Sequence, residues 1–287
     1  ENAKDILTEW QRATDMGADL VVTGEHALSG YPLQDAVEDP DLLEKVEQEL
    51  EALAIATKDG AGLLVGCPLR IKGRIYNCAV LLEGGKIAQI IQKTELPNDG
   101  AFDEKRNYSA GKPQEVVLFR GHKLGVMICE DAWQRPAAKN LAAQGAEMLI
   151  VLNGSPYYQG KLQKRINDVV QPRADETGLP LLYVNLVGSQ DELVFDGASF
   201  VCHPGQQSAV VQARAFATET LLTEWKDNSD GKLRCVTRVQ HPVPSAEEEL
   251  YQALVLGMRD YVRKNGIKKV VLGLSGGIDS AIVAAIA

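Results

Sequence analysis

Residues 123–153 read KLGVMICEDAWQRPAAKNLAAQGAEMLIVLN, and they contain the strand–helix–strand pattern on which the fold prediction rests. Its first apolar run predicts a buried strand, the alanine-rich segment near 135–145 predicts a helix, and the apolar run at 147–153 predicts a second buried strand. Cys129 falls at the turn between the first strand and the helix. Such a turn lifts a side chain out of a sheet and into a cleft, so Cys129 is a candidate nucleophile. The nearby helix N-terminus and any cation would lower the pKa of its thiol.

Helices and apolar strands alternate on both sides of this stretch. The expected elements are helices over 2–16, 41–58 and 159–177, strands over 19–24, 62–67, 115–119 and 179–187, a hairpin joining 77–83 to 86–93 around Gly84-Gly85, and a further hairpin turning at Asp196-Gly197. This mixture predicts a layered α/β domain whose sheets contain both parallel and antiparallel pairs.

Composition narrows the class of protein. With 45% apolar and 24% charged residues, the chain has the composition of an ordinary soluble globular protein. It has no long apolar run and no signal-peptide pattern at its start, so we expect a cytoplasmic location and no membrane. The net charge of −9 argues against nucleic acid as a partner and favours a small-molecule substrate. Five cysteines without a CxxC spacing indicate neither a disulfide framework nor a zinc site.

Two further residues could assist a cysteine nucleophile, one as a base and one as a stabilising cation. None of the four histidines is an obvious base, because all fall in turn-like or polar settings, so a carboxylate would have to move the proton. Partial desolvation would have to bring its pKa towards neutrality, and Glu25, at the end of the strand at 19–24, fits that requirement. Lys93 ends the strand at 86–93, where an ammonium could stabilise an oxyanion. Each residue also has an ordinary interpretation, because free cysteines are usually small core residues and charges at strand ends are usually solvated.

Three segments together resemble the nitrilase, or carbon-nitrogen hydrolase, superfamily: GEHALSGYP around Glu25, KTELPNDGAFDEKR after Lys93, and ICEDAW around Cys129. The resemblance implies an αββα sandwich. It also implies that Glu25 is the general base, that Lys93 stabilises the tetrahedral intermediate, and that Cys129 forms a thioester. The family's first strand would precede residue 1, so we expect this piece alone to be a poor catalyst.

A narrower resemblance, to the glutaminase domain of glutamine-dependent NAD synthetases, rests on ICEDAW, NGSPYYQGK at 153–161 and NLVGSQDELVFDGASF at 185–200. It implies that Ser155 and Lys161 hold glutamine and that Glu104 is a second carboxylate near the triad, with no cofactor at this site. The sequence departs from the family in two places: Thr23-Gly24 replace the usual Phe-Pro before the glutamate, and Asp99 replaces a common tyrosine.

The chain closes with KKVVLGLSGGIDSAIVAAIA, which predicts a strand over Val270–Leu274, a glycine turn and a helix starting near Asp279. Amide groups at a helix N-terminus favour phosphate, and the lysine of the GxxxxGK[ST] loop is absent. SGGIDS resembles the pyrophosphate loop of ATP-dependent synthetases and implies the first elements of a Rossmann-like adenine nucleotide α-hydrolase domain. By this resemblance Asp279 helps to hold Mg2+, and the residues that contact ATP are Gly273, Leu274, Ser275, Gly276, Gly277, Ile278, Asp279 and Ser280.

Together the resemblances imply a ligase of NAD biosynthesis. Residues 1–242 would form the glutaminase domain and residues 243–287 the truncated start of the synthetase domain, with glutamine, ATP and deamido-NAD as small-molecule partners and a homo-oligomer as the assembly. Three alternatives are another amidase of the superfamily, a non-catalytic scaffold with the same fold, and a ligase fed only by free ammonia. The last would not need a triad on some 240 residues.

Overall fold

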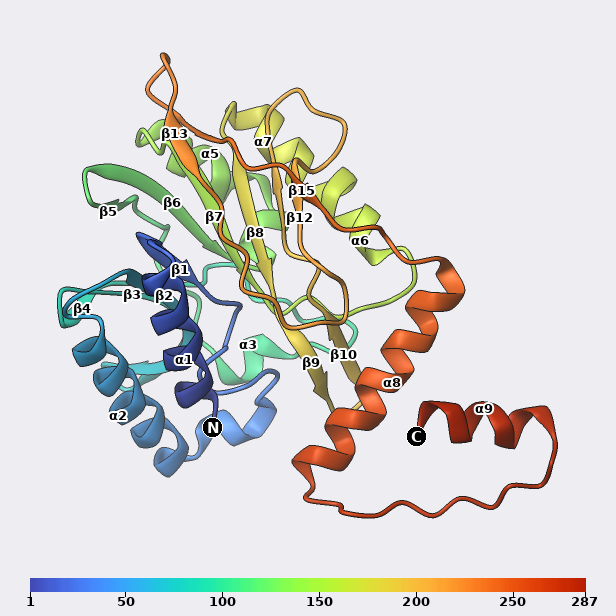
Figure 1. The fold of residues 1–287 in the computed structure, drawn as a ribbon. Coiled ribbons are helices and arrows are strands. Elements are labelled where there is room, and N and C mark those ends of the chain that lie inside the picture. Colours follow the sequence, from blue (N-terminus) through green and yellow to red (C-terminus); the bar gives the residue numbers. More distant parts are fainter.

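The computed structural model describes all residues, 1–287, and shows two sheets packed face to face with helices outside them (Figure 1). The helical elements are α1 (Asn2–Asp15), the 3-10 helix η1 (Gln34–Glu38), α2 (Pro40–Ala56), α3 (Glu104–Asn107), α4 (Glu130–Trp133), α5 (Arg135–Ala143), α6 (Lys161–Lys164), the π-helix η2 (Arg165–Val170), α7 (Gln171–Thr177), α8 (Ala246–Lys264) and α9 (Ile278–Ile286). No helix combines the length and the apolar character that crossing a membrane requires.

The strands are β1 (Leu20–Val22), β2 (Gly62–Ile71), β3 (Arg74–Glu83), β4 (Lys86–Gln92), β5 (Val117–Phe119), β6 (His122–Ile128), β7 (Met148–Asn153), β8 (Leu181–Asn185), β9 (Val187–Gln190), β10 (Leu193–Asp196), β11 (Phe200–Cys202), β12 (Val211–Gln212), β13 (Trp225–Asp227), β14 (Leu233–Cys235) and β15 (Val239–Gln240). One sheet has four strands in the order β1-β2-β3-β4, and another has seven in the order β15-β12-β11-β8-β7-β6-β5. Strands β6, β7 and β8 run parallel, as does the β1/β2 pair, while β2, β3 and β4 alternate in direction.

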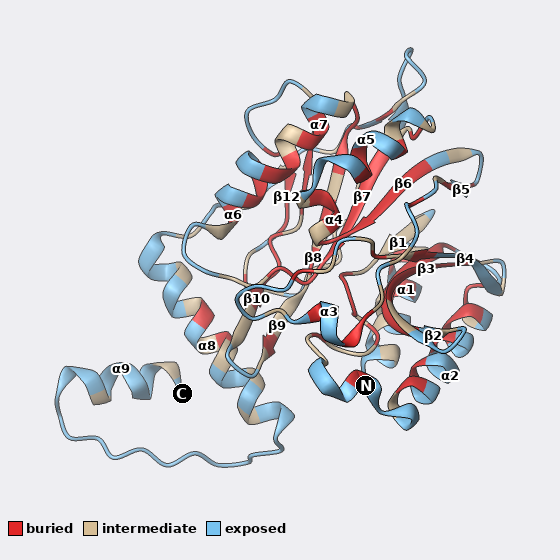
Figure 2. Cartoon of the chain, turned by 180° about the vertical axis from the view of Figure 1, so that it is seen from behind, coloured by how far each residue is buried: buried red, intermediate tan, exposed pale blue.

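Because successive side chains of a strand point to opposite faces of its sheet, the buried apolar residues form three large cores. In β7, Leu149 and Val151 pack toward α5 and η2, whereas Ile150 and Leu152 pack between the two sheets. In β2, Leu63 and Val65 pack toward α1 and α2. Because both faces of these strands are buried, their sequences read as continuous apolar runs. Figure 2 shows the buried residues concentrated in the sheets and on the inner faces of the helices. The predicted αββα sandwich is therefore confirmed.

Most predicted elements lie where they were expected. The hairpin at Gly84-Gly85 is present, with positive φ at both glycines. The hairpin predicted at Asp196-Gly197 is wrong: β9 and β10 pair through a turn at residues 191–192, and Asp196 ends β10. The predicted helix over 159–177 forms as α6, η2 and α7, because a π turn interrupts the α-helical pattern.

Helix α8 packs against the β9–β10 hairpin. Ser245 caps its N-terminus by accepting from the Glu248 amide, and Asp260 accepts a hydrogen bond from the Ser189 amide at 2.9 Å. Leu256 packs with Phe216 in a small apolar cluster. The first helix after the predicted domain boundary at residue 242 is thus attached to the larger body of the chain.

The predicted strand over Val270–Leu274 is wrong, although the helix after it is present as α9. A strand needs a neighbouring strand to satisfy its backbone hydrogen bonds, and none lies beside these residues. The segment is instead extended and exposed, and Val271 is 98% exposed (Figures 1 and 2).

Candidate active site

Three strand ends bring Glu25, Lys93 and Cys129 to the same edge of the two sheets. Lys93 directly follows β4, Cys129 directly follows β6, and Glu25 lies three residues after β1. The Lys93 Nζ atom lies 2.7 Å from Glu25 Oε1, and both side chains are completely buried. The charges of Glu25 and Lys93 both influence the Cys129 thiol, so the three predicted residues lie in one electrostatic environment.

Hydrogen bonds hold both oxygens of the Glu25 carboxylate. Asn77 Nδ2 donates to Oε1 at 2.8 Å, and the Gly154 amide, directly after β7, donates to Oε2 at 2.8 Å. The carboxylate therefore has a fixed orientation, and it joins the four-stranded sheet to the end of β7.

Glycines allow the backbone to approach Glu25 closely. A side chain on Gly66 would place its first carbon 2.5 Å from the Gly24 carbonyl oxygen, and one on Gly154 would lie 2.6 Å from the Tyr31 ring. Gly24 is itself crowded, because a Cβ there would lie 2.7 Å from Leu186. The Thr23-Gly24 departure from the family pattern thus fits this structure: Gly24 fills a tight space, and the Thr23 hydroxyl accepts from the Gly66 amide at 3.3 Å.

Glu104 also lies at the site, as the family resemblance implies. Lys93 Nζ lies 2.9 Å from its Oε1 and 2.8 Å from its Oε2, so the ammonium sits between two carboxylates. The hydroxyl of buried Tyr31 donates to Glu104 Oε1 at 2.7 Å. Sequence reasoning missed Tyr31, since nothing in its local pattern indicates a contact with a residue far along the chain.

The Cys129 backbone is strained at the turn between β6 and α4. Its φ of +44° and ψ of −100° lie in a region that residues other than glycine rarely adopt, and its amide donates to the Leu152 carbonyl at 2.9 Å. The residue is 6% exposed, whereas Cys67, Cys78, Cys202 and Cys235 are fully buried. Cys129 is thus the least buried of the five cysteines.

The direction of the Cys129 pKa corrects one expectation. A helix N-terminus and a cation were expected to lower it, but burial and the neighbouring charge of Glu25 raise the pKa of the thiol well above its usual value, and Lys93 only partly opposes them. Helix α4 has only four residues, so its dipole is weak. The thiol is therefore protonated at rest and needs a base in order to react.

The two glutamates differ in the direction of their pKa shifts. Burial pushes the pKa of Glu25 upward, but Lys93, His26 and the hydrogen bonds outweigh burial and hold the pKa below its ordinary value. Glu25 was expected to shift toward neutrality, so this expectation is wrong. The upward shift belongs to Glu104, where burial outweighs the attraction of Lys93. For Lys93, the two carboxylates outweigh burial and raise the pKa well above its ordinary value.

His26 adjoins Glu25 but has the wrong character for a base. Burial lowers the pKa of this fully buried imidazole to about 4. Its Nδ1 lies 3.0 Å from the Ser29 hydroxyl. His26 lies in a turn, as expected, although it is buried there, and the inference that no histidine provides a Cys-His pair agrees with this neutral ring.

Ser155 and Lys161 lie in the loop and helix that follow β7. The Ser155 amide donates to Asn185 Oδ1 at 2.9 Å, and its hydroxyl accepts from the buried Arg165 at 3.1 Å. The Lys161 ammonium lies 4.6 Å from the centre of the Trp133 ring, and no carboxylate pairs with it. Desolvation lowers the pKa of Lys161, and the electrostatic influence of Cys129 reaches it. An unpaired cation therefore lies near the candidate nucleophile.

The residues predicted to contact ATP form one exposed turn between the extended segment and α9. Gly276 has a φ of +89°, and the Ser275 and Ser280 hydroxyls lie 3.1 Å apart across the turn. Asp279 occupies the first turn of α9. Open backbone amides and small side chains fit a phosphate group, so the loop is compatible with the predicted ligand.

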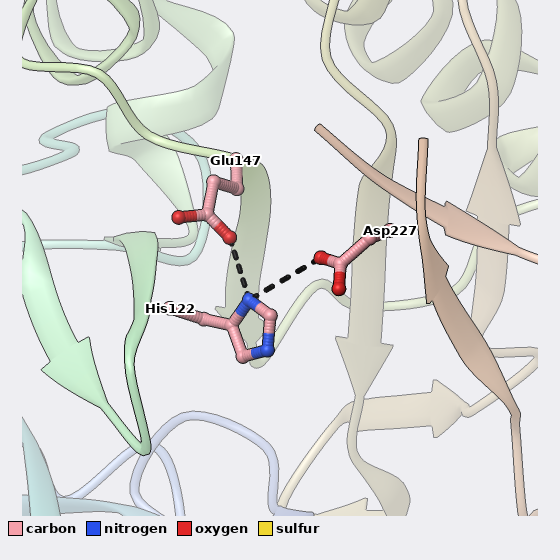
Figure 3. A group of neighbouring side chains, drawn as sticks. All are labelled: His122, Glu147 and Asp227. Atoms are coloured by element: carbon pink, nitrogen blue, oxygen red, sulfur yellow. Dashed lines mark hydrogen bonds and ion pairs between the residues drawn. The ribbon is translucent and has the colours of Figure 1, made fainter. Parts of the chain in front are cut away.

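A second group of potential metal ligands lies away from the triad. His122 Nδ1 is 2.6 Å from Glu147 Oε2 and 3.9 Å from Asp227 Oδ1 (Figure 3). The shorter distance is that of a hydrogen bond between the imidazole and the carboxylate. These contacts link the β13–β14 hairpin to the edge of β6 and β7.

Two family models match separate parts of the chain. The carbon-nitrogen hydrolase model covers residues 1–228, and the NAD synthase model covers residues 250–287. The first match contains all three triad positions, and the second contains the glycine turn before α9.

Individual proteins show the same division. A glutamine-dependent NAD(+) synthetase from Rhodobacter capsulatus is 43% identical over all of this chain, and the match covers 51% of that protein. The structure of the glutamine-dependent NAD+ synthetase from Acinetobacter baumannii in complex with ADP superposes with a TM-score of 0.90 at 37% identity, covering 99% of this chain and 53% of that chain. An amidase of the nitrilase superfamily from Nesterenkonia AN1, at 24% identity, has a TM-score of 0.65 and covers 74% of this chain and 80% of its own. The chain thus spans about half the length of the synthetases that it matches.

Proposed function

The chain belongs to the carbon-nitrogen hydrolase family, and from this premise we propose that it hydrolyses glutamine to supply ammonia for the ATP-dependent amidation of deamido-NAD. The observation that carries the proposal is the Lys93 ammonium, buried between the carboxylates of Glu25 and Glu104 beside the Cys129 turn. Burying charged groups has a high desolvation cost, and clusters of buried titratable groups are concentrated at functional sites. Amide cleavage through a thiol would use the charges of Glu25 and Lys93.

The first half-reaction forms a thioester. Glu25 takes the proton of the Cys129 thiol, and the thiolate attacks the side-chain amide carbon of glutamine. Lys93 stabilises the oxyanion that develops on the amide oxygen. Glu25 then gives its proton to the amide nitrogen, the carbon-nitrogen bond breaks, and ammonia leaves.

The second half-reaction returns the enzyme to its resting state. Glu25 takes a proton from a water molecule, and the resulting hydroxide attacks the thioester carbon. The carbon-sulfur bond breaks, glutamate leaves, and Glu25 returns the proton to Cys129. Glutamine and water therefore give glutamate and ammonia. The raised pKa of the thiol explains why the base must act in the first step.

Lys161 and Ser155 are the residues that we propose hold glutamine. The Lys161 ammonium has no carboxylate partner in the protein, so it can pair with the α-carboxylate of the substrate. Ser155 belongs to a rigid loop, because Arg165 holds its hydroxyl and its carbonyl. Arg165 is itself paired with Asp196 at 2.8 Å, which keeps the loop beside the triad.

The ammonia would be consumed in the domain that begins after residue 242. We propose that residues 273–280 contact ATP, that Asp279 helps to hold Mg2+, and that ammonia attacks the adenylated carboxylate of deamido-NAD to give NAD and AMP. The NAD synthase match over residues 250–287 and the exposed turn at Gly276 support this assignment. We further propose a homo-oligomer in the cytoplasm, which light scattering and cell fractionation would test.

A diazo-ketone analogue of glutamine tests the proposed function in the full-length gene product. We expect one adduct, on Cys129, detected by peptide mass spectrometry and absent from the Cys129→Ala variant. We also expect glutamine to be hydrolysed much faster than short aliphatic amides, whereas the reverse preference would indicate another amidase of the superfamily. No labelling of the wild-type protein would contradict the proposal and favour a non-catalytic scaffold.

A further inference from the structure

Asp131 lies behind the triad and touches neither Glu25 nor Lys93 directly, yet its carboxylate accepts five hydrogen bonds and is completely buried. We propose that Asp131 is a positioning residue, which fixes the Cys129 turn relative to Lys93. The proposal rests on the function proposed above, since it concerns the geometry of that reaction.

One oxygen of Asp131 holds the segment that follows Lys93. Oδ1 accepts from the Thr94 amide at 3.0 Å, from the Thr94 hydroxyl at 2.7 Å and from the Glu95 amide at 2.8 Å. Because these donors come directly after Lys93, the backbone that carries the ammonium cannot shift without breaking them.

The other oxygen holds the residue before the nucleophile. Oδ2 accepts from the Ile128 amide at 3.0 Å and from Gln114 Nε2 at 2.8 Å. Ile128 is the last residue of β6, and Cys129 follows it with a strained backbone. A strained conformation persists only where its surroundings hold it, and the bond to Ile128 is one such restraint.

The two held segments belong to different sheets. Lys93 follows β4 of the four-stranded sheet, and Cys129 follows β6 of the seven-stranded sheet. No backbone ladder joins the two sheets, and apolar packing between them fixes distances less sharply than hydrogen bonds do. Asp131 supplies a polar link between them at the edge where the reaction would occur.

The Asp131→Asn variant isolates one half of this link. Asparagine has one acceptor oxygen and one amide nitrogen that only donates. The oxygen would take the Oδ1 position, where it accepts from three donors. The nitrogen would then take the Oδ2 position and face the Ile128 and Gln114 donors without being able to accept from them. The variant thus releases the Cys129 turn while it retains the bonds to Thr94 and Glu95. Leu50→Ala is the matched control, because Leu50 is buried between α2 and β2 and its loss destabilises the protein without touching the link.

The experiment compares both variants with the wild type in the full-length gene product. Three quantities are measured: kcat and KM for glutamine, the rate at which iodoacetamide alkylates Cys129 across pH 7 to 10, and thermal unfolding. A displacement of about 1 Å in a reacting group can cost about 100-fold in rate, so we expect Asp131→Asn to lower kcat by about 10- to 100-fold with KM within about threefold. We also expect a changed pH profile of alkylation, whereas Leu50→Ala keeps the wild-type profile and kcat.

Equal unfolding temperatures of the two variants, together with wild-type kcat and alkylation in Asp131→Asn, would overturn the proposal and leave Asp131 a purely structural residue. The iodoacetamide comparison does not require glutamine. If the wild-type protein hydrolyses no glutamine, the proposed function fails, while the alkylation profiles still decide whether Asp131 positions Cys129.

Discussion

Replacing Lys93 by methionine should destabilise the protein strongly. Its ammonium lies 2.7 Å from Glu25 and 2.8 Å from Glu104, and all three side chains are buried. Methionine fills a similar volume but leaves two carboxylates facing each other without a cation. Removing one partner of a buried ion pair costs about 3–5 kcal/mol. At roughly 2 °C per kcal/mol for a chain of this size, the melting temperature at pH 7 falls by about 6–10 °C.

The loss should depend on pH in a defined direction. In the wild type the pKa of Glu25 is held below its ordinary value, so this group contributes stability above its unfolded pKa and loses it as the pH falls. Without Lys93, burial and mutual repulsion would raise the pKa of both carboxylates. The folded variant would then bind more protons than the unfolded chain, and its stability would increase as the pH falls. The deficit relative to the wild type should therefore be smaller at pH 5 than at pH 8.

Urea unfolding of the wild type and the Lys93→Met variant at pH 5 and pH 8 measures both effects. Lys86→Met is the control, because Lys86 begins the same strand, β4, and is exposed without an ion pair. We expect the control to match the wild type at both pH values. A Lys93→Met variant with wild-type stability, or with a deficit that is larger at pH 5, would show that the buried ammonium does not stabilise the two carboxylates.

Three further outcomes follow from the site. Cys129→Gly should be more stable than Cys129→Ala by about 1 kcal/mol in urea unfolding, because glycine relieves the positive φ of this position; equal stabilities would show that the turn is not strained. Lys161→Met should raise KM for glutamine about tenfold or more with little change in kcat, because a charge-assisted contact is lost. The control variant Lys164→Met changes an exposed lysine and should leave KM unchanged. An unchanged KM in Lys161→Met would remove Lys161 from the glutamine site. Because the pKa of Cys129 is raised, its alkylation by iodoacetamide should still accelerate as the pH passes 9; a plateau below pH 8 would indicate a stabilised thiolate instead.

Local patterns in the sequence predicted the layers and the ends of the strands well. Apolar runs bounded by turn residues located β2, β4, β6 and β7, and the polar residues at their ends indicated where a site could form. The strand expected over 270–274 failed for a reason that a pattern cannot show, since a strand exists only beside another strand.

The environment of the site could not be read from the chain. Tyr31 and Asp131 act on groups that lie far from them in sequence, so only the fold reveals their contacts. The pKa directions were also out of reach, because they depend on the balance between burial and neighbouring charges. The pKa of Glu25 is lowered and the pKa of Glu104 is raised, although both are glutamates beside the same lysine.

The glycines at 66 and 154 limit how this pocket could be redesigned. At each position the backbone lies close to Glu25 or its neighbours, so even one added methyl group would collide with main chain or with the Tyr31 ring. An engineer who wants to admit bulkier amides therefore gains no room there. The Trp133 and Tyr158 rings beside the Lys161 ammonium are not under this constraint, so they are the side chains to shorten instead.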